Sequence, residues 1–257
     1  MSSAFTRRAV IRIGSVAALL PLWAQRDAEA ADGARDLASA QTKGDAEAMT
    51  DDEASRGSKS RLIGIVLFDD FETLDVFGPV QMWGRLPEHR LLFISPNGGA
   101  VTSAQGTVVN VGSSFGSAPQ LDILMVPGGM GTRPLVKDAA LLDFVRRQDR
   151  ATRWTVSVCT GAAILARAGV LDGRQATTNK LAFDWVSSQS DKVRWRRKAR
   201  WVFDGKYATS SGVSAGTDMA LALVEKLYGR KAAEHAAMIA EYQWHDDPDN
   251  DPFASGQ

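Results

Sequence analysis

The stretch Trp154–Gly169, WTVSVCTGAAILARAG, holds the only cysteine among the 257 residues of the chain. Its first five residues, WTVSV, form a short apolar run typical of a strand that is buried on both faces. The residues after Cys159 are small and apolar, and they predict a helix that ends at Gly169. Cys159 therefore lies at a sharp turn from strand to helix, which is the geometry of a nucleophile elbow.

Short apolar runs alternate with helical patterns on both sides of this turn, from Arg61 onward. We expect buried strands at 61–68, 90–96, 121–129 and 154–158, an antiparallel excursion within 97–116, a hairpin at 200–211, and helices at 73–86, 139–150, 161–169, 179–189, 214–229 and 231–244. Thr73 is the expected N-cap of the first helix, and Asp204-Gly205 the expected hairpin turn. This alternation predicts an open, mostly parallel sheet with helices on both faces, a flavodoxin-like α/β fold. Reactive groups of such sheets lie at the carboxyl ends of the strands.

The N-terminal segment has the features of an export signal. Arg7 and Arg8 precede the apolar stretch IGSVAALLPLWA, which is shorter than the roughly 20 residues that span a bilayer. Small residues at Ala28 and Ala30 suit cleavage by signal peptidase. We interpret 1–30 as a twin-arginine signal peptide, with a Sec signal as the alternative, and expect an exported, periplasmic protein without a membrane span after processing.

Composition and charge set the organisation of the remaining chain. Residues 31–60 are rich in Ala, Asp, Glu, Ser and Gly and predict a disordered linker, so 61–257 is expected to be a single domain. The formal net charge is zero and the pI is about 6.8, which gives no reason to expect a nucleic-acid partner or an anionic membrane surface. The basic run Lys192–Arg200 is more typical of a solvated face. The chain ends soon after the last predicted helix, so we expect no fused DNA-binding domain.

The position of Cys159 suggests a reactive thiol. A helix N-terminus stabilises a thiolate, so we expect the pKa of Cys159 to be lowered from its usual value of about 8.5. Backbone N–H groups of Gly128, Gly129 and Thr160 are candidates for an oxyanion hole. The alternative is a buried structural cysteine that serves as a small apolar residue.

The motifs FETLDVFGP, VPGGMG, SVCTGAAILARAGVLDGRQATT and SSGVSAGTDMALALVEKL together resemble the ThiJ/PfpI superfamily, which has the class I glutamine amidotransferase-like fold. The similarity extends from Arg61 to about Phe253 and is strongest to the branch with isonitrile hydratase and the ligand-binding half of AraC-type regulators. The resemblance implies that Cys159 is the nucleophile, that Asp75 is the acidic residue that meets the thiol, and that Thr160 is the polar residue after it. It also implies that Gly128 and Gly129 flank the nucleophile, and that the protein is a homodimer.

The chain departs from the superfamily pattern at two positions. Thr160 stands where the protease- and amidase-like branches have a histidine base, and Asn179 stands where much of the nearest branch has a second histidine. Asn179 is therefore a candidate substrate-pocket residue rather than a base. His89, His235 and His245 are expected to lie away from the cleft, so a Cys–His dyad is not expected. Asp218, which also matches the superfamily, is expected to have a structural role.

Three functions remain open. The first is an isonitrile-hydratase-like lyase acting on a small molecule, in which Cys159 attacks the isonitrile carbon and a protonated Asp75 supplies acid and base. The second is an exported ligand-binding or redox-sensing module without catalysis, in which Cys159 is oxidised stepwise. The third is a glyoxalase- or deglycase-like activity. None of them requires an organic cofactor, and no Cys/His cluster has the spacing of a metal site.

Overall fold

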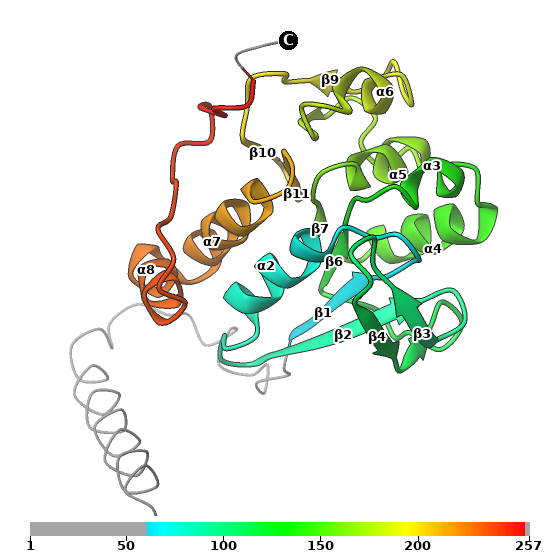
Figure 1. Cartoon of the computed structure of the whole chain (residues 1–257), viewed down its shortest axis with the longest axis horizontal. Coiled ribbons are helices and arrows are strands. Elements are labelled where there is room, and N and C mark those ends of the chain that lie inside the picture. Colours follow the sequence, from blue (N-terminus) through cyan, green and yellow to red (C-terminus); the bar gives the residue numbers. More distant parts are fainter. Residues whose placement is uncertain (1–60, 255–257) are drawn as a thin grey trace, which may run out of the picture. The chain divides into compact units, whose positions relative to one another are not determined.

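A seven-stranded sheet forms the centre of the molecule (Figure 1), as seen in a computed structural model that describes residues 61–254. The predicted signal peptide (1–30) and linker (31–60) lie outside the described residues. The strands are β1 (Arg61–Val66), β2 (His89–Ser95), β5 (Ser113–Ser114), β6 (Ile123–Val126), β7 (Trp154–Ser157), β10 (Trp201–Asp204) and β11 (Tyr207–Ser210). Their order is β10-β11-β7-β6-β1-β2-β5, and every neighbouring pair is parallel except β10–β11. The predicted mostly parallel, flavodoxin-like sheet is confirmed.

Helices cover both faces of this sheet. The structure contains α2 (Thr73–Trp83), α3 (Thr132–Leu135), α4 (Ala139–Asp149), α5 (Gly161–Arg167), α6 (Phe183–Ser187), α7 (Ala215–Tyr228) and α8 (Arg230–Ile239). Helices α2, α7 and α8 pack together on one face, and α3, α4 and α5 pack together on the other (Figure 1). Strands β6 and β7 are therefore buried from both sides, which explains their nearly continuous apolar sequence.

The smaller elements match the prediction in part. The antiparallel pair β3 (Gly99–Thr102) and β4 (Val108–Val111) and the β10–β11 hairpin were both predicted. Strand β5, the short helix α3 and the pair β8 (Gln175–Ala176) and β9 (Arg194–Trp195) were not. These elements have two to four residues, too few for a periodic pattern to mark them in the sequence.

The start of α2 differs from the prediction. The N-cap is Glu72, not Thr73, and Thr73 is the first helical residue. The Thr73 hydroxyl donates instead toward Ser103 and Gln105, on the segment that follows β3. Leu74 is 46% exposed, whereas Trp83, nine residues further along the helix and on its opposite side, is buried. The buried stripe of the helix includes Asp75, Val76 and Pro79.

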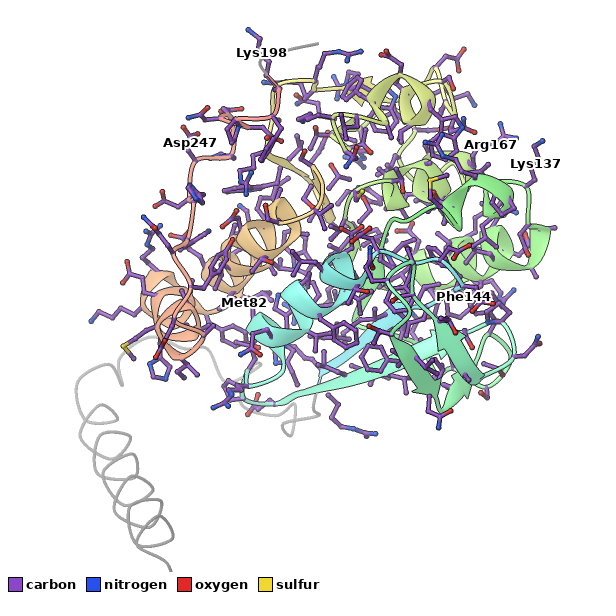
Figure 2. All side chains as sticks on the ribbon, viewed as in Figure 1. Met82, Lys137, Phe144, Arg167, Lys198 and Asp247 are labelled. Carbon is purple, nitrogen blue, oxygen red and sulfur yellow. The ribbon has the colours of Figure 1, made fainter. Side chains whose placement is uncertain are left out.

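The segment after α8 runs away from that helix and returns to the neighbourhood of β9 and β10 (Figure 1). The backbone N–H of Arg200 donates to the carbonyl of Pro248 at 2.7 Å, which ties the segment to the start of β10. Among the described residues, the helices are too short and too polar for any of them to traverse a bilayer. The side chains that surround these elements are drawn in Figure 2.

Candidate active site

Cys159 occupies the turn between β7 and α5 with a left-handed backbone conformation, φ 55°. Residues other than glycine rarely adopt a positive φ, and such strain persists only where the surroundings hold it. Two hydrogen bonds do so here: the N–H of Cys159 donates to Ser211 O at 3.2 Å, and Thr178 Oγ1 donates to Cys159 O at 2.7 Å. The predicted strand-to-helix elbow at Cys159 is confirmed.

Two glycines allow the backbone to approach this residue closely. A Cβ at Gly128 would lie 2.5 Å from Thr160 N and 2.8 Å from Cys159 Cβ. A Cβ at Gly212 would lie 2.9 Å from Cys159 Sγ and 2.3 Å from Asn179 Nδ2. Gly128 was singled out from the sequence; Gly212, which follows β11, was not. The one feature of the sequence that could have identified Gly212 is its position just after a strand whose carboxyl end faces the cleft.

The N–H groups of the glycine pair are already engaged. Gly128 N donates to Asp75 Oδ2 at 2.9 Å, and Gly129 N donates to Thr160 Oγ1 at 3.0 Å. The expectation that these two groups form an open oxyanion hole is therefore corrected: they hold the side chains of Asp75 and Thr160 in place. The N–H of Thr160 does interact with the Cys159 sulfur, so it is the member of the predicted set that faces the thiol.

Asp75 comes from the first turn of α2 and has no exposed surface. One carboxyl oxygen, Oδ2, accepts from the Gly128 N–H, and the carboxyl also interacts with the Cys159 thiol. Burial raises the pKa of Asp75 well above its ordinary value, and the charge of Glu72 raises it further, against the lowering effect of the Gly128 N–H. The carboxyl is therefore held toward its protonated form, which the sequence argument required of an acid at this position.

Burial also raises the pKa of the Cys159 thiol well above its ordinary value, and the Asp75 carboxylate raises it further by charge repulsion. Hydrogen bonds from the Thr160 N–H and the Asn179 amide act in the opposite direction and are weaker. The expected lowered pKa of Cys159 is thus wrong. Helix α5 has only seven residues, and its N-terminal field does not offset the removal of the thiol from water. Both groups are thus held toward their protonated forms.

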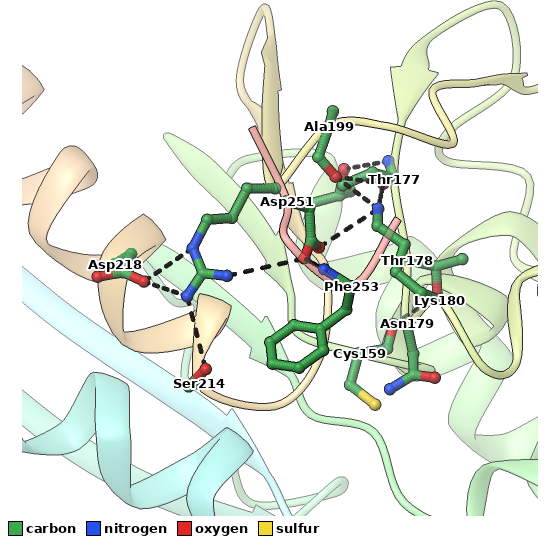
Figure 3. Close-up of polar contacts among 12 residues, drawn as sticks. Cys159, Thr177, Thr178, Asn179, Lys180, Ala199, Ser214, Asp218, Asp251 and Phe253 are labelled. Atoms are coloured by element: carbon green, nitrogen blue, oxygen red, sulfur yellow. Dashed lines mark hydrogen bonds and ion pairs between the residues drawn. The ribbon is translucent and has the colours of Figure 1, made fainter. Parts of the chain in front are cut away.

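Asn179 connects the thiol to the far wall of the site. Its amide interacts with the Cys159 sulfur, and its Oδ1 accepts from Ala182 N at 3.0 Å, just before α6. The close-up in Figure 3 shows the two side chains together. The second hydrogen bond orients the amide so that its N–H₂ group, not its oxygen, is turned toward the sulfur.

The Thr160 side chain is buried between neighbours rather than directed at the thiol. Its hydroxyl accepts from Gly129 N and lies 3.1 Å from Thr132 Oγ1, which belongs to α3. Sequence reasoning missed Thr132, because α3 is too short to be recognised. Thr160 therefore supplies its backbone N–H to the sulfur, while its hydroxyl joins β7 to the Gly129 turn.

The three histidines and Asp218 lie away from the thiol. His89 begins β2 and contacts Tyr228, His235 lies on α8, and His245 donates its backbone N–H to Asp218. Asp218 is fully buried and accepts from Arg200 Nε at 2.9 Å, so its expected structural role is confirmed. Within residues 61–254, no three His, Cys, Asp or Glu side chains are grouped so that they could hold a metal ion.

Two adjoining cavities open beside Cys159. The first, called here the nucleophile cavity, has a volume of about 260 Å³ and includes Cys159, Thr160, Glu72 and Arg133 in its wall. The second, called the apolar cavity, has a volume of about 420 Å³ and is lined by Leu74, Asn179, Lys180, Leu181, Gly212, Val213, Ser214 and Phe253. The aromatic side chains of Trp83, Phe183, Trp185 and Trp244 line neither cavity.

Comparisons with known proteins agree on the family. The model described as DJ-1/PfpI family matches residues 61–226. The chain is 36% identical over 180 residues to isonitrile hydratase of Pseudomonas putida, a match that covers 70% of this chain and 78% of that protein. It is 29% identical over 185 residues to the HTH-type transcriptional regulator GbdR of Pseudomonas aeruginosa, covering 70% of this chain and 49% of the regulator. A solved ThiJ/PfpI family protein from Pseudomonas syringae is similar with a TM-score of 0.68 at 28% identity, over 83% of this chain and 87% of that one.

Proposed function

Because the chain belongs to the DJ-1/PfpI family, we propose that it is a cysteine-dependent hydratase that converts an isonitrile to an N-substituted formamide. The observation that carries the proposal is the buried pair of Cys159 and Asp75, each with a raised pKa. A proton donor beside a thiol suits addition of S–H across a small electrophile better than hydrolysis of a peptide, for which a histidine base would be expected. The similarity to isonitrile hydratase supports the choice of substrate class.

The first step forms a thioimidate. Asp75 gives its proton to the terminal carbon of the isonitrile, the Cys159 sulfur bonds to that carbon, and the thiol proton passes to the Asp75 carboxylate. The product is R–N=CH–S–Cys159, and the pair has exchanged one proton without separating charge. Raised pKa values of both groups are compatible with this step, because neither group must stay ionised in a largely buried site.

The second step releases the formamide. Asp75, again protonated, donates a proton to the imine nitrogen of the thioimidate. Its carboxylate then accepts a proton from the water that attacks the thioimidate carbon, which is bonded to the Cys159 sulfur. Collapse of the adduct breaks the S–C bond, returns a proton to the sulfur and frees R–NH–CHO. Asn179 and the Thr160 N–H stabilise negative charge on the sulfur as it leaves, since both already interact with it.

The proposal is tested by incubating the full chain with a panel of isonitriles and with methylglyoxal, and measuring formamide and lactate by chromatography. Formamide production by the wild type, lost in Cys159→Ala and reduced by on the order of 10²–10⁴ in Asp75→Asn, is the expected outcome. Formamide production at the wild-type rate by Cys159→Ala would overturn the mechanism. Lactate in place of formamide would favour the glyoxalase-like alternative.

The remaining parts of the proposal concern location and assembly. The twin-arginine pattern supports export to the periplasm, and the resemblance to the superfamily supports a homodimer. The formal net charge of zero supports a small-molecule substrate rather than a nucleic-acid partner. A non-catalytic redox-sensing role is less well supported, because the raised pKa of Cys159 disfavours the thiolate that oxidation requires.

A further inference from the structure

The apolar cavity holds large hydrophobic side chains that no other part of the described chain covers. Leu181 is 89% exposed, Phe253 is 66% exposed and Leu74 is 46% exposed. All three line the same cavity, although they come from the segment before α6, the C-terminal segment and α2. Exposed apolar side chains gathered in one concave place are typical of a ligand site.

This cavity is continuous with the site of chemistry. Asn179, Leu181 and Val213 line both the apolar cavity and the nucleophile cavity. Asn179 interacts with the Cys159 sulfur and also forms part of the wall of the apolar cavity. A molecule whose reactive end reaches Cys159 therefore has its remaining part directed past Asn179, toward Leu181 and Phe253.

The cavity offers no free charge to a ligand. Its one charged lining residue is Lys180, and the Lys180 Nζ donates to Thr177 Oγ1 at 3.0 Å and to Ala199 O at 2.5 Å. It also lies 3.6 Å from Asp251 Oδ2. The ammonium group is thus satisfied inside the protein and is 4% exposed at the side-chain level, so an anionic substituent would lose its hydration without gaining a partner.

Phe253 is held in the wall by buried charges. Its backbone N–H donates to Asp251 Oδ1 at 3.0 Å, and Asp251 lies between Lys180 and Arg200, whose Nη1 is 3.9 Å away. Arg200 in turn is anchored to Asp218 on α7 (Figure 3). A buried carboxylate needs compensating charge, and Lys180 and Arg200 supply it to Asp251, although Asp251 Oδ2 receives no hydrogen bond within the described chain. Asp251 in turn holds the backbone of Phe253 beside the cavity.

We propose that the apolar cavity binds the N-substituent of the substrate and that this substituent is an uncharged hydrocarbon group, aryl or branched alkyl. The inference rests on the proposed function for the identity of the reacting end. The volume of the apolar cavity, about 420 Å³, falls within the range of small-molecule pockets, so the cavity has room for a benzyl or cyclohexyl group. Leu181 and Phe253 are the specificity-determining residues.

The test measures binding and needs no turnover. The affinities of N-benzylformamide, N-methylformamide and N-formylglycine for the full chain are measured by NMR titration. The benzyl compound is expected to bind at least about tenfold more tightly than the methyl compound, and N-formylglycine the most weakly. Leu181→Ser and Phe253→Ala are expected to abolish the preference for benzyl. The matched control is Val108→Ala, which removes a side chain that is 63% exposed on β4 and lines neither cavity.

Each outcome separates the inference from the proposed function. Equal affinities, absence of benzyl binding, or tightest binding of N-formylglycine would overturn the subsite whether or not isonitriles react. Selective benzyl binding without isonitrile turnover would keep the subsite and remove the hydratase. If the two variants change the oligomeric state measured by light scattering and leave the binding preference intact, the face is an interface between copies and the inference is wrong. Because Leu181 is almost fully exposed, its variant remains informative even if Phe253→Ala fails to fold.

Discussion

The Asp75 carboxylate raises the pKa of the Cys159 thiol, and burial raises the pKa of both groups. The two side chains come from α2 and from the β7–α5 turn, and Gly128 N binds the Asp75 Oδ2 atom between them. Because the thiolate is the nucleophilic form of cysteine, this relationship is expected to make Cys159 less reactive than an exposed cysteine at the same pH.

Replacement of Asp75 by asparagine is expected to separate thiol reactivity from catalysis. Without the neighbouring negative charge, the pKa of Cys159 falls, so alkylation of Cys159 by iodoacetamide at pH 8 becomes faster than in the wild type. Isonitrile hydration falls at the same time, because the proton donor is lost. Mass spectrometry of the alkylated protein across a pH series gives the pKa directly. Asp70→Asn, at an exposed acidic residue that also has a positive φ, is the control and should change neither quantity.

The same substitution is expected to stabilise the fold at neutral pH. The pKa of Asp75 is raised in the folded state, so the folded protein binds the proton more tightly than the unfolded chain and loses this advantage as pH rises from about 4 through the raised pKa. The amide side chain that Asp75→Asn introduces carries no charge at any pH. The variant's free energy of unfolding should exceed that of the wild type by on the order of 1–3 kcal/mol at pH 7 and match it near pH 4. Urea unfolding at both pH values measures the difference; a variant less stable than the wild type at pH 7 would contradict it.

Gly212→Ala is expected to reduce activity through steric contact with the thiol. Its Cβ would lie 2.9 Å from Cys159 Sγ and 2.3 Å from Asn179 Nδ2, so at least one of the two must move. We expect a loss of at least about tenfold in kcat, because displacement of reacting groups by about 1 Å costs up to 10²-fold. Gly112→Ala is the matched control: its Cβ meets nothing within 4 Å, and activity should be unchanged. Full activity of Gly212→Ala would show that the Asn179 contact is dispensable.

Asp251→Asn is expected to weaken both stability and recognition of apolar substrates. Removal of this charge leaves the buried Lys180 and Arg200 without part of their compensation, at a cost of about 3 kcal/mol in the free energy of unfolding. The pKa of Lys180, already lowered to about 8 by burial, should fall further, because Asp251 opposes that effect. KM for a benzyl isonitrile should rise more than KM for a methyl isonitrile.

The control for this prediction lies in the same segment. Asp249 is 78% exposed at the side-chain level and lies 3.9 Å from Arg196. Exposed pairs of this kind contribute at most about 1 kcal/mol. Asp249→Asn should therefore leave the melting temperature and the ratio of the two KM values near those of the wild type, and equal effects of the two substitutions would argue against a special role for the buried network.

Local patterns along the chain were sufficient for the sheet and the elbow at Cys159, and the resemblance to the superfamily implied that Asp75 meets the thiol. The apolar runs of β6 and β7 mark strands buried on both faces, and parallel strands bring their carboxyl ends to one edge of the sheet. The catalytic roles of Cys159, Asp75 and Thr160 remain predictions. Local patterns could not predict whether the pKa of Cys159 is raised or lowered, because the shift depends on how completely the fold removes the thiol from water.

The partners of the polar groups and the shape of the cleft depended on tertiary packing. The Gly128 and Gly129 N–H groups were expected to face a substrate, but α2 and α3 bring Asp75 and the Thr132–Thr160 pair within reach of these donors. Phe253 enters the cavity wall only because Asp251 meets Lys180 and Arg200 from distant parts of the sequence. Periodicity reports which side of an element is buried, whereas pKa values and cavity walls are set by contacts between elements that no local pattern encodes.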